Sequence, residues 1–467
     1  MDQSVKTGRK RKQHLCCRNA AIALLLALGA ACSHFSGLLP SIPFRISHST
    51  EGEPAVNVEK LDNGLTVLIK ESHANPIVTL NVWINTGSAN EPPELNGVSH
   101  FLEHMMFKGT ERRPPGKVDV DIESVGGETN AAASKDFTHY YVTVASDYIT
   151  TGLDVLSDTL MNSTLLPDEV ERERQVILEE YRRKQDSSFP FLYDLVCEEA
   201  YLAGPYRQSV LGVTETISSI TRAQLFDYYK RYYAPDNMVL VVVGDVKPQT
   251  VMPLVRKYFG PYRHKARPFD HLDRQTRWAT AASIKTVEKD KRETYAVLVF
   301  PAPSIENARE TIIMDVVLGI LSDGRSSRLY QSLREQKKLV SSIGASYGTS
   351  RMPGMFGVAA TLEAKNLEAM RKAVIEEIER IRTHLVGRRE LAKVKKMATN
   401  DYYFENETTN GQAEKLGFFY VLTGSEKYEK NYLRELRRVM PADIRRVAQK
   451  YLDPKRAVMV VLRPKAG

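Results

Sequence analysis

The alternation of apolar and polar residues predicts a chain in which strands and helices are interspersed. Residues 56–72 contain an Asn63–Gly64 turn between two strand-like stretches, and residues 77–86 (IVTLNVWINT) alternate as a half-buried strand does. Further segments follow, with helical spacing at 98–108, 149–163, 168–185 and 221–233 and strand-like runs at 138–146 and 238–243. This mixture indicates packed layers of sheet and helix, in an α+β or α/β arrangement.

An internal repeat predicts two homologous domains. Residues 221–243 align without gaps onto residues 440–462, and each copy consists of an amphipathic helix, a Pro turn and an apolar strand. Because each copy ends a half of similar length, we expect two domains of roughly 200 residues. We place the first domain at 56–261, a polar and Arg-rich linker at 262–284, and the second domain at 285–467.

The first 55 residues are expected to lie outside these domains. A basic stretch precedes the apolar run 20–31 (AAIALLLALGAA), which as a helix spans roughly 18 Å, short of the ~30 Å hydrocarbon core of a bilayer. These features make residues 1–32 typical of a signal peptide, so we expect export to the periplasm, with the Ser- and Pro-containing residues 33–55 as a tether. Cys32 follows Gly-Ala-Ala as in a lipoprotein cleavage site, but the usual Leu three residues earlier is missing. A lipid anchor on Cys32 and a soluble form therefore both stay open.

Composition and charge exclude several classes of protein. The chain of 467 residues is 42% hydrophobic and 26% charged, as in an ordinary folded protein with a sizeable core. Its net charge is +8, of which residues 1–32 contribute +5, with six basic residues against Asp2. A nucleic-acid-binding surface requires basic residues clustered on the folded part, and the sequence has no such block. Three of the four cysteines lie in the leader region, leaving Cys197 alone, so no disulfide framework is expected.

The strongest chemical signal is the segment His100-Phe-Leu-Glu103-His104. Apolar residues at 98, 101, 102, 105 and 106 have the spacing of a helix with one buried stripe, so both histidines project together, away from that stripe. Two imidazoles one turn apart can grip a zinc ion, and the neighbouring carboxylate can take a proton from metal-bound water. The motif also arises by chance, and two solvated histidines would be inert. A metal enzyme therefore requires a third ligand.

A helix expected at 167–185 carries candidates for that ligand. Glu173, Val176, Ile177 and Glu180 share one face by spacing, which places two carboxylates beside two aliphatic side chains. Buried carboxylates are costly unless they are paired or bound to a metal. The other charged residues of the segment are expected on the solvated surface, namely Glu171, Arg172, Arg174 and Glu179. The alternative is a surface charge run whose apolar stripe lies elsewhere.

These segments together resemble the pitrilysin/insulinase family of zinc metallopeptidases, in the branch that includes the mitochondrial processing peptidase β-subunit. The resemblance rests on residues 97–110 (GVSHFLEHMMFKGT) and on a glutamate 76 residues after the motif, and it extends over residues 56–464. It implies an α+β fold of two homologous domains, each a mixed sheet packed with helices. It also implies one zinc ion per chain, held by His100, His104 and Glu180, with Glu103 as general base and Glu173 as a second catalytic acid.

The resemblance also implies how substrate binds. Residues 126–144 (GGETNAAASKDFTHYYVTV) resemble the family segment whose edge strand pairs with the substrate backbone, which assigns Asn130, Ala131 and Ala132 to substrate binding. Arg334 matches a family Arg that contacts substrate, but Ser341 stands where the family often has a Tyr. Since Ser is too short for that role, either this branch tolerates the change or a partner subunit that lacks the zinc motif supplies the Arg–Tyr pair. We expect a homodimer or a heterodimer with such a related subunit.

The function implied by the resemblance is that of a zinc-dependent endopeptidase acting on extended peptides or flexible polypeptide segments. The alternative is a non-catalytic peptide-binding or structural subunit of a peptidase complex. Family members that lost catalysis usually lost the zinc residues, whereas the three implied ligands and the implied base Glu103 are all present here. Metal content separates the two hypotheses.

Overall fold

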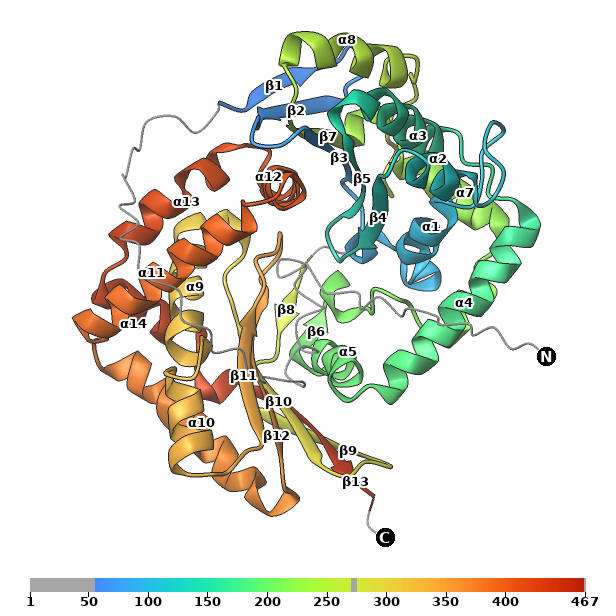
Figure 1. The fold of residues 1–467 in the computed structure, drawn as a ribbon. Helices are drawn as coiled ribbons and strands as arrows, with labels where there is room; N and C mark the ends of the chain where they lie inside the picture. Colours follow the sequence, from blue (N-terminus) through green and yellow to red (C-terminus); the bar gives the residue numbers. More distant parts are fainter. Residues whose placement is uncertain (1–54, 270–274, 466–467) are drawn as a thin grey trace, which may run out of the picture.

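The computed structural model describes residues 55–269 and 275–465, which form two halves that each contain a mixed β-sheet and helices (Figure 1). The expected signal peptide, Cys32 and nearly all of the tether lie outside the described residues. Among the residues described, none of the helices combines the length and the apolarity that crossing a bilayer requires.

The first half contains a six-stranded sheet in the order β1-β2-β7-β3-β5-β4. Its strands are β1 (Asn57–Lys60), β2 (Thr66–Glu71), β3 (Ile77–Ile84), β4 (Glu128–Ala133), β5 (Thr138–Ala145) and β7 (Met238–Gly244). Strands β2 and β7 run parallel, and the other neighbours are antiparallel. The Asn63–Gly64 turn joins β1 to β2 as predicted, and Gly64 adopts a φ of +97° there, where Gly is favoured. Strand β4 forms one edge of the sheet, with a neighbour only in β5.

Seven helices belong to this half: α1 (Val98–Met106), α2 (Lys117–Glu123), α3 (Ile149–Met161), α4 (Pro167–Asp186), α6 (Thr214–Ser219), α7 (Arg222–Tyr232) and α8 (Pro248–Phe259). The helical spacing predicted at 98–108, 149–163, 168–185 and 221–233 is thus confirmed to within two residues at each end. One face of the sheet, with Leu80, Val82 and Val142, packs in a common core with the apolar residues of α1, α3 and α7. The predicted apolar stripe of α1 is fully buried in this core.

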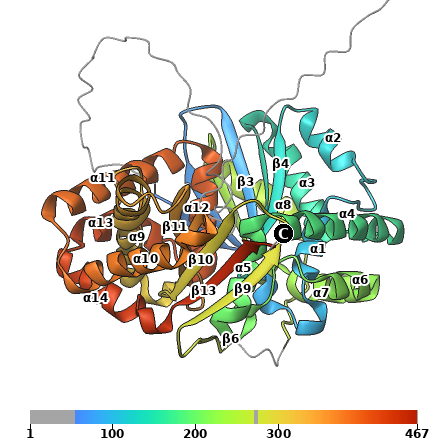
Figure 2. The same ribbon diagram turned by 90° about the horizontal axis from the view of Figure 1, so that it is seen from below.

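The second half contains a five-stranded sheet in the order β11-β12-β10-β13-β9. Its strands are β9 (Ser283–Lys289), β10 (Thr294–Pro301), β11 (Ser342–Tyr347), β12 (Met355–Leu362) and β13 (Val458–Pro464). Its helices are α9 (Ala308–Ser322), the π-helical segment η8 (Tyr330–Gln336), α10 (Leu367–Thr383), α11 (Arg388–Glu405), α12 (Thr409–Thr423), α13 (Lys427–Arg438) and α14 (Pro441–Tyr451). Most of these helices gather on the side of the sheet away from the first half (Figure 2).

The two halves share one topology, which confirms the predicted α+β fold of two homologous sheet-and-helix domains. The repeat forms α7 followed by β7 in the first half and α14 followed by β13 in the second. Strand β7 lies between β2, to which it is parallel, and β3, to which it is antiparallel. Strand β13 lies in the same way between β9, to which it is parallel, and β10, to which it is antiparallel. From these strands outward, β5 and β4 continue the first sheet as β12 and β11 continue the second.

Each sheet is covered on its second face by a helix from the other half. Helix α12 packs on β3 and β7, where Gly417 of α12 lies so close to Trp83 that a Cβ would stand 2.0 Å from the indole Nε1. Conversely, α5 (Ser188–Ala200) packs its apolar residues on β10 and β13. Helix α5 thus lies within the predicted first domain in sequence but covers the second sheet. The predicted linker 262–284 also contains regular structure, since β8 (Arg277–Trp278) pairs with β6 (Tyr201–Ala203) and β9 begins at Ser283.

Candidate metal centre

Helix α1 places His100 and His104 one turn apart and opposite its buried stripe. The two rings lie 4.8 Å apart between centroids at an interplanar angle of 67°. Burial and the neighbouring His104 lower the pKa of His100 to about 4, so this imidazole is neutral near pH 7 and has a lone pair to offer a metal.

Helix α4 crosses α1 and contributes the acidic side chains (Figure 1). Pro167 occupies the first turn of α4, where its missing N–H costs no helical hydrogen bond. Arg183 and Lys184 occupy the last turn, where their positive charges suit the helix dipole. Two predictions about its faces are wrong. Val176, expected on the face shared with Glu173 and Glu180, is 44% exposed. Arg174, expected on the solvated surface, is only 7% exposed, because its guanidinium lies 5.3 Å from the Phe101 ring and donates hydrogen bonds to the carbonyls of Ile217 and Ile220. The buried face therefore includes Arg174, which fixes α4 against α1.

The structure brings His100, His104 and Glu180 together. Glu180 Oε2 lies 3.6 Å from the Nε2 atoms of both His100 and His104, and one donor atom of each residue falls within 4.8 Å of the others. A distance of 3.6 Å is long for a hydrogen bond. It is close to the separation of about 3.4 Å between two ligands bound tetrahedrally at 2.0–2.2 Å to one zinc ion. The His₂Glu donor set also fits zinc, so these residues fit a zinc ion on both distance and chemistry.

Glu173 lies behind His104 and does not join the cluster of ligand atoms. Its Oε2 accepts a hydrogen bond from His104 Nδ1 at 3.0 Å, and its Oε1 is 2.8 Å from Lys108 Nζ. Burial raises the pKa of the Glu173 carboxyl, but the partners His104 and Lys108 outweigh burial and hold the pKa below its usual value. Both oxygens of Glu173 are thus engaged, and its contact with Nδ1 of His104 leaves Nε2 of that residue toward Glu180. The catalytic role of Glu173 stays a prediction.

Glu103 lies half-buried on α1 beside the end of β4. Burial, assisted by Glu180, raises the pKa of Glu103 to about 7, against the opposing effects of His104 and of a hydrogen bond from the backbone of Ala133. A carboxylate with a pKa near neutrality is suited to accept and return a proton. The contact with Ala133 also connects this group to the edge strand.

The predicted substrate-binding residues fall in two separate places. Asn130, Ala131 and Ala132 lie on edge strand β4, which leaves one side of its backbone without a strand neighbour in the described residues. Arg334 is exposed on η8, which packs on β11 and α10 of the second half. Ser341 donates a hydrogen bond to the carbonyl of Thr361 in that half. The structure thus keeps Arg334 on a different half from the three candidate ligands.

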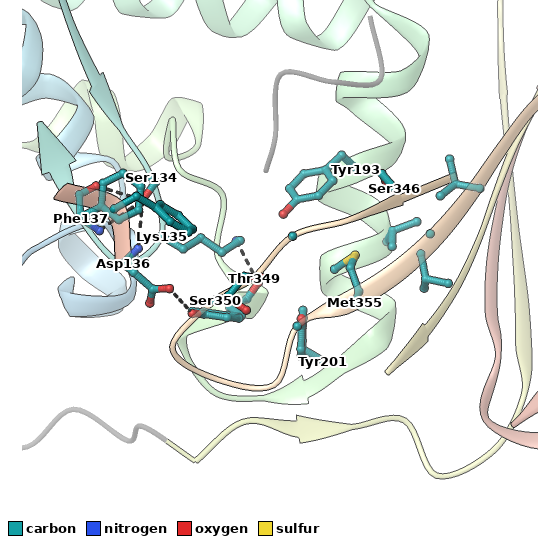
Figure 3. A pocket seen from close by; sticks show the side chains of 18 residues that line it. Ser134, Lys135, Asp136, Phe137, Tyr193, Tyr201, Ser346, Thr349, Ser350 and Met355 are labelled. Carbon is teal, nitrogen blue, oxygen red and sulfur yellow. Dashed lines mark hydrogen bonds between the residues drawn. The ribbon is translucent and has the colours of Figure 1, made fainter. Parts of the chain in front are cut away.

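The turn after β4 is anchored to the second half beside a small cavity of about 90 Å³ (Figure 3). Asp136 accepts a hydrogen bond from the backbone N–H of Arg351 at 2.9 Å, in the loop between β11 and β12. Lys135 is buried and donates to the carbonyls of Tyr206 and Gln208. The edge strand therefore ends in a fixed turn, which directly follows Ala133, the residue whose backbone contacts Glu103.

Two residues of this region escaped prediction from the sequence. Lys108 lies four residues after His104, so helical spacing could have indicated its place beside Glu173. Glu91 contacts the start of α1 from outside the helix, and no sequence pattern marks it.

Two family models match the chain. Residues 66–214 match the family model of the insulinase domain (peptidase family M16), and residues 219–398 match that of the peptidase M16 inactive domain. The first match contains His100, Glu103, His104 and Glu180, and the second contains Arg334.

Several relatives span most of both chains. An uncharacterized zinc protease of Bacillus subtilis is 29% identical over 81% of this chain and 91% of its own. An uncharacterized zinc protease of Mycobacterium leprae is 31% identical over 68% and 71%, and a probable mitochondrial-processing peptidase subunit beta of Arabidopsis thaliana is 27% identical over 88% and 79%. The crystal structure of a protease from Helicobacter pylori superposes with a TM-score of 0.84 at 25% identity, covering 88% of this chain and all of that one. The chain therefore belongs to the M16 family of peptidases, the pitrilysin/insulinase family.

Proposed function

We propose that this protein is a zinc-dependent endopeptidase that hydrolyses extended peptides or flexible polypeptide segments. The observation that carries the proposal is that Glu180 Oε2 on α4 lies 3.6 Å from the Nε2 atoms of both His100 and His104 on α1, with all three ligand atoms within 4.8 Å of one another. A bound zinc ion would polarise the scissile carbonyl and make water acidic enough to lose a proton near neutral pH.

The chain's own residues supply the remaining steps. Glu103 accepts the proton of the attacking water on its carboxylate and returns it to the leaving amine. Glu173 keeps the proton of His104 on Nδ1, so that Nε2 stays available as a ligand. A substrate segment pairs with the free edge of β4 at Asn130–Ala132 through its backbone. This mode favours peptides that can present an extended strand and disfavours folded proteins.

The proposal extends to a partner and a location. Because Ser341 is too short for the role of the family Tyr, we propose that this chain pairs with a second copy or with a related subunit without the zinc motif, the latter supplying the Arg–Tyr pair. Size-exclusion chromatography with light scattering, on protein purified under native conditions, tests for this pairing. We also propose export to the periplasm, with a lipid anchor on Cys32. Mass spectrometry of the mature N-terminus, in the intact chain and in Cys32→Ser, tests the anchor.

The variant Glu103→Gln tests the proposed mechanism. It should retain zinc, because Glu103 is not among the ligands, but lose peptide cleavage by roughly 10²–10⁴-fold, because the proton acceptor is gone. Zinc content is measured by mass spectrometry of the gently purified protein, and cleavage with a peptide library in the presence and absence of chelator. Glu179→Gln, on the exposed side of α4, is the matched control and should cleave normally. Retention of most activity in Glu103→Gln would refute the base assignment, and a zinc-free wild-type protein would favour a non-catalytic peptide-binding subunit.

A further inference from the structure

A buried carboxylate outside α1 holds the first turn of this helix. Glu91 follows the short helix η2 (Ser88–Asn90) and is only 1% exposed. Its Oε1 accepts a hydrogen bond from the backbone N–H of Ser99 at 2.8 Å, and its Oε2 accepts one from that of Gly97 at 2.7 Å. The side chain of Asn96 donates a third, at 3.0 Å. Glu91 therefore satisfies backbone amides that the start of a helix otherwise leaves unpaired.

No side chain within the helix start can make this cap. A helix usually carries Ser, Thr, Asp or Asn at its N-cap, but the N-cap here is Gly97 with a φ of +97°. A Cβ on Gly97 would stand 2.6 Å from the carbonyl oxygen of Leu211 and 2.9 Å from the Cα of Gly212. The close approach of this second backbone segment thus requires glycine, and the acceptor has to come from elsewhere in the chain.

The same turn is held by a second set of contacts. The Ser99 hydroxyl lies 3.0 Å from the Tyr228 hydroxyl, which lies 2.8 Å from that of Thr86. Ser99 is therefore fixed both through its backbone, by Glu91, and through its side chain, by α7. His100 is the next residue, so any shift of this turn moves the imidazole relative to Glu180.

We propose that Glu91 is a positioning residue for the metal centre, which sets the start of α1 so that His100 Nε2 meets Glu180 Oε2. The inference rests on the proposed zinc site. A buried carboxylate is costly in stability, and its place at the positive end of the helix that carries both histidines offsets part of that cost. The role is to fix ligand geometry, beyond capping the helix.

The variant Glu91→Gln tests the inference. The amide keeps the shape of the side chain, but its NH₂ faces either Ser99 N–H or Gly97 N–H, so at least one capping hydrogen bond is lost. Zinc affinity, measured by competition with a chromophoric chelator, should fall about 10- to 100-fold, as for other residues that orient metal ligands. The visible spectrum of the cobalt-substituted protein, which reports ligand geometry, should change, and kcat should fall with KM nearly unchanged. Glu91→Asp keeps the charge but is one methylene shorter, so it should lose less affinity.

Controls separate this inference from the proposed function and from a loss of fold. Asp443→Asn removes the acidic cap from α14 in the second half, where Asp443 accepts a hydrogen bond from Met440 N–H at 3.0 Å, and should leave zinc affinity unchanged. A wild-type protein that binds no zinc would refute the proposed function. The positioning role would be overturned if wild type binds zinc and the folded variants Glu91→Gln and Glu91→Asp bind it with the same affinity and give the same cobalt spectrum. If neither variant folds, as judged by circular dichroism, Glu91 is a structural residue and the inference is likewise overturned.

Discussion

Replacement of Asp315 by Asn should stabilise the protein in a strongly pH-dependent way. Asp315 lies on α9, where Tyr432 donates a hydrogen bond to it at 3.1 Å. Burial, together with Glu405 and Asp323, raises the pKa of Asp315 from 3.8 to about 7, despite that hydrogen bond. Because the folded state holds the proton more tightly than the unfolded state, the free energy of unfolding falls as pH rises from about 4 to about 7.

The shift of about three pKa units corresponds to about 4 kcal/mol lost above pH 7. The asparagine side chain of the variant would stay neutral at every pH, and its amide oxygen can still accept the hydrogen bond from Tyr432. The stability gain of Asp315→Asn over wild type should therefore grow by about 3 kcal/mol between pH 5 and pH 8. Urea unfolding followed by circular dichroism, in the presence of chelator at both pH values, measures this difference.

A matched control is Asp401→Asn. Asp401 is exposed and, like Asp315, lines a cavity of about 220 Å³ in the second half. Its carboxylate keeps contact with water, so the gain of Asp401→Asn should vary by less than about 1 kcal/mol over this range. An equal gain at pH 5 and pH 8 for Asp315→Asn would refute the reasoning.

Two further substitutions test the supports of the centre and of the interface between the halves. Glu173→Gln removes the charge behind His104, so zinc affinity measured by chelator competition should fall about 10- to 100-fold, whereas Glu179→Gln should not change it; equal affinities would contradict the positioning role. Gly417→Ala places a methyl group against Trp83 and should lower the free energy of unfolding in urea by roughly 1–3 kcal/mol. Gly387→Ala, where an added Cβ meets no atom within 4 Å, should have little effect, and equal effects would contradict the packing argument.

The two halves share one architecture but differ at the helix that carries the candidate metal ligands. Helix α9 follows β10 as α1 follows β3, but its sequence, ARETIIMDVVLGILS, contains no histidine. In the residues that the structure describes, the second half keeps this strand order without a cluster of side chains suited to a metal, and its residues up to 398 fall within the match to the inactive-domain model. The shared topology follows from the repeated pattern of apolar positions, whereas the candidate metal ligands are a few side chains placed on one copy.

The sequence alone determined the features that depend on local pattern. The period of apolar residues placed α1 and its buried stripe, and with them the common direction of His100 and His104, because helical geometry relates residues four apart. The gapless repeat predicted two related halves, and the four helices predicted for the first half were found close to their predicted bounds, whereas α2, α6 and α8 were not predicted. Spacing also put Glu173 and Glu180 on the acidic helix, but it left open which of them meets the histidines.

Only the tertiary structure decided how these elements meet. The crossing of α1 and α4 gives Glu180 to the ligand cluster and leaves Glu173 behind His104, bound to Lys108. The docking of a separate backbone segment on Gly97 determines that Glu91 caps the helix from outside. Helices α5 and α12 each cover the sheet of the other half, which no local pattern encodes. Such contacts join residues far apart in the chain, and their partners are chosen by the packing of the whole molecule.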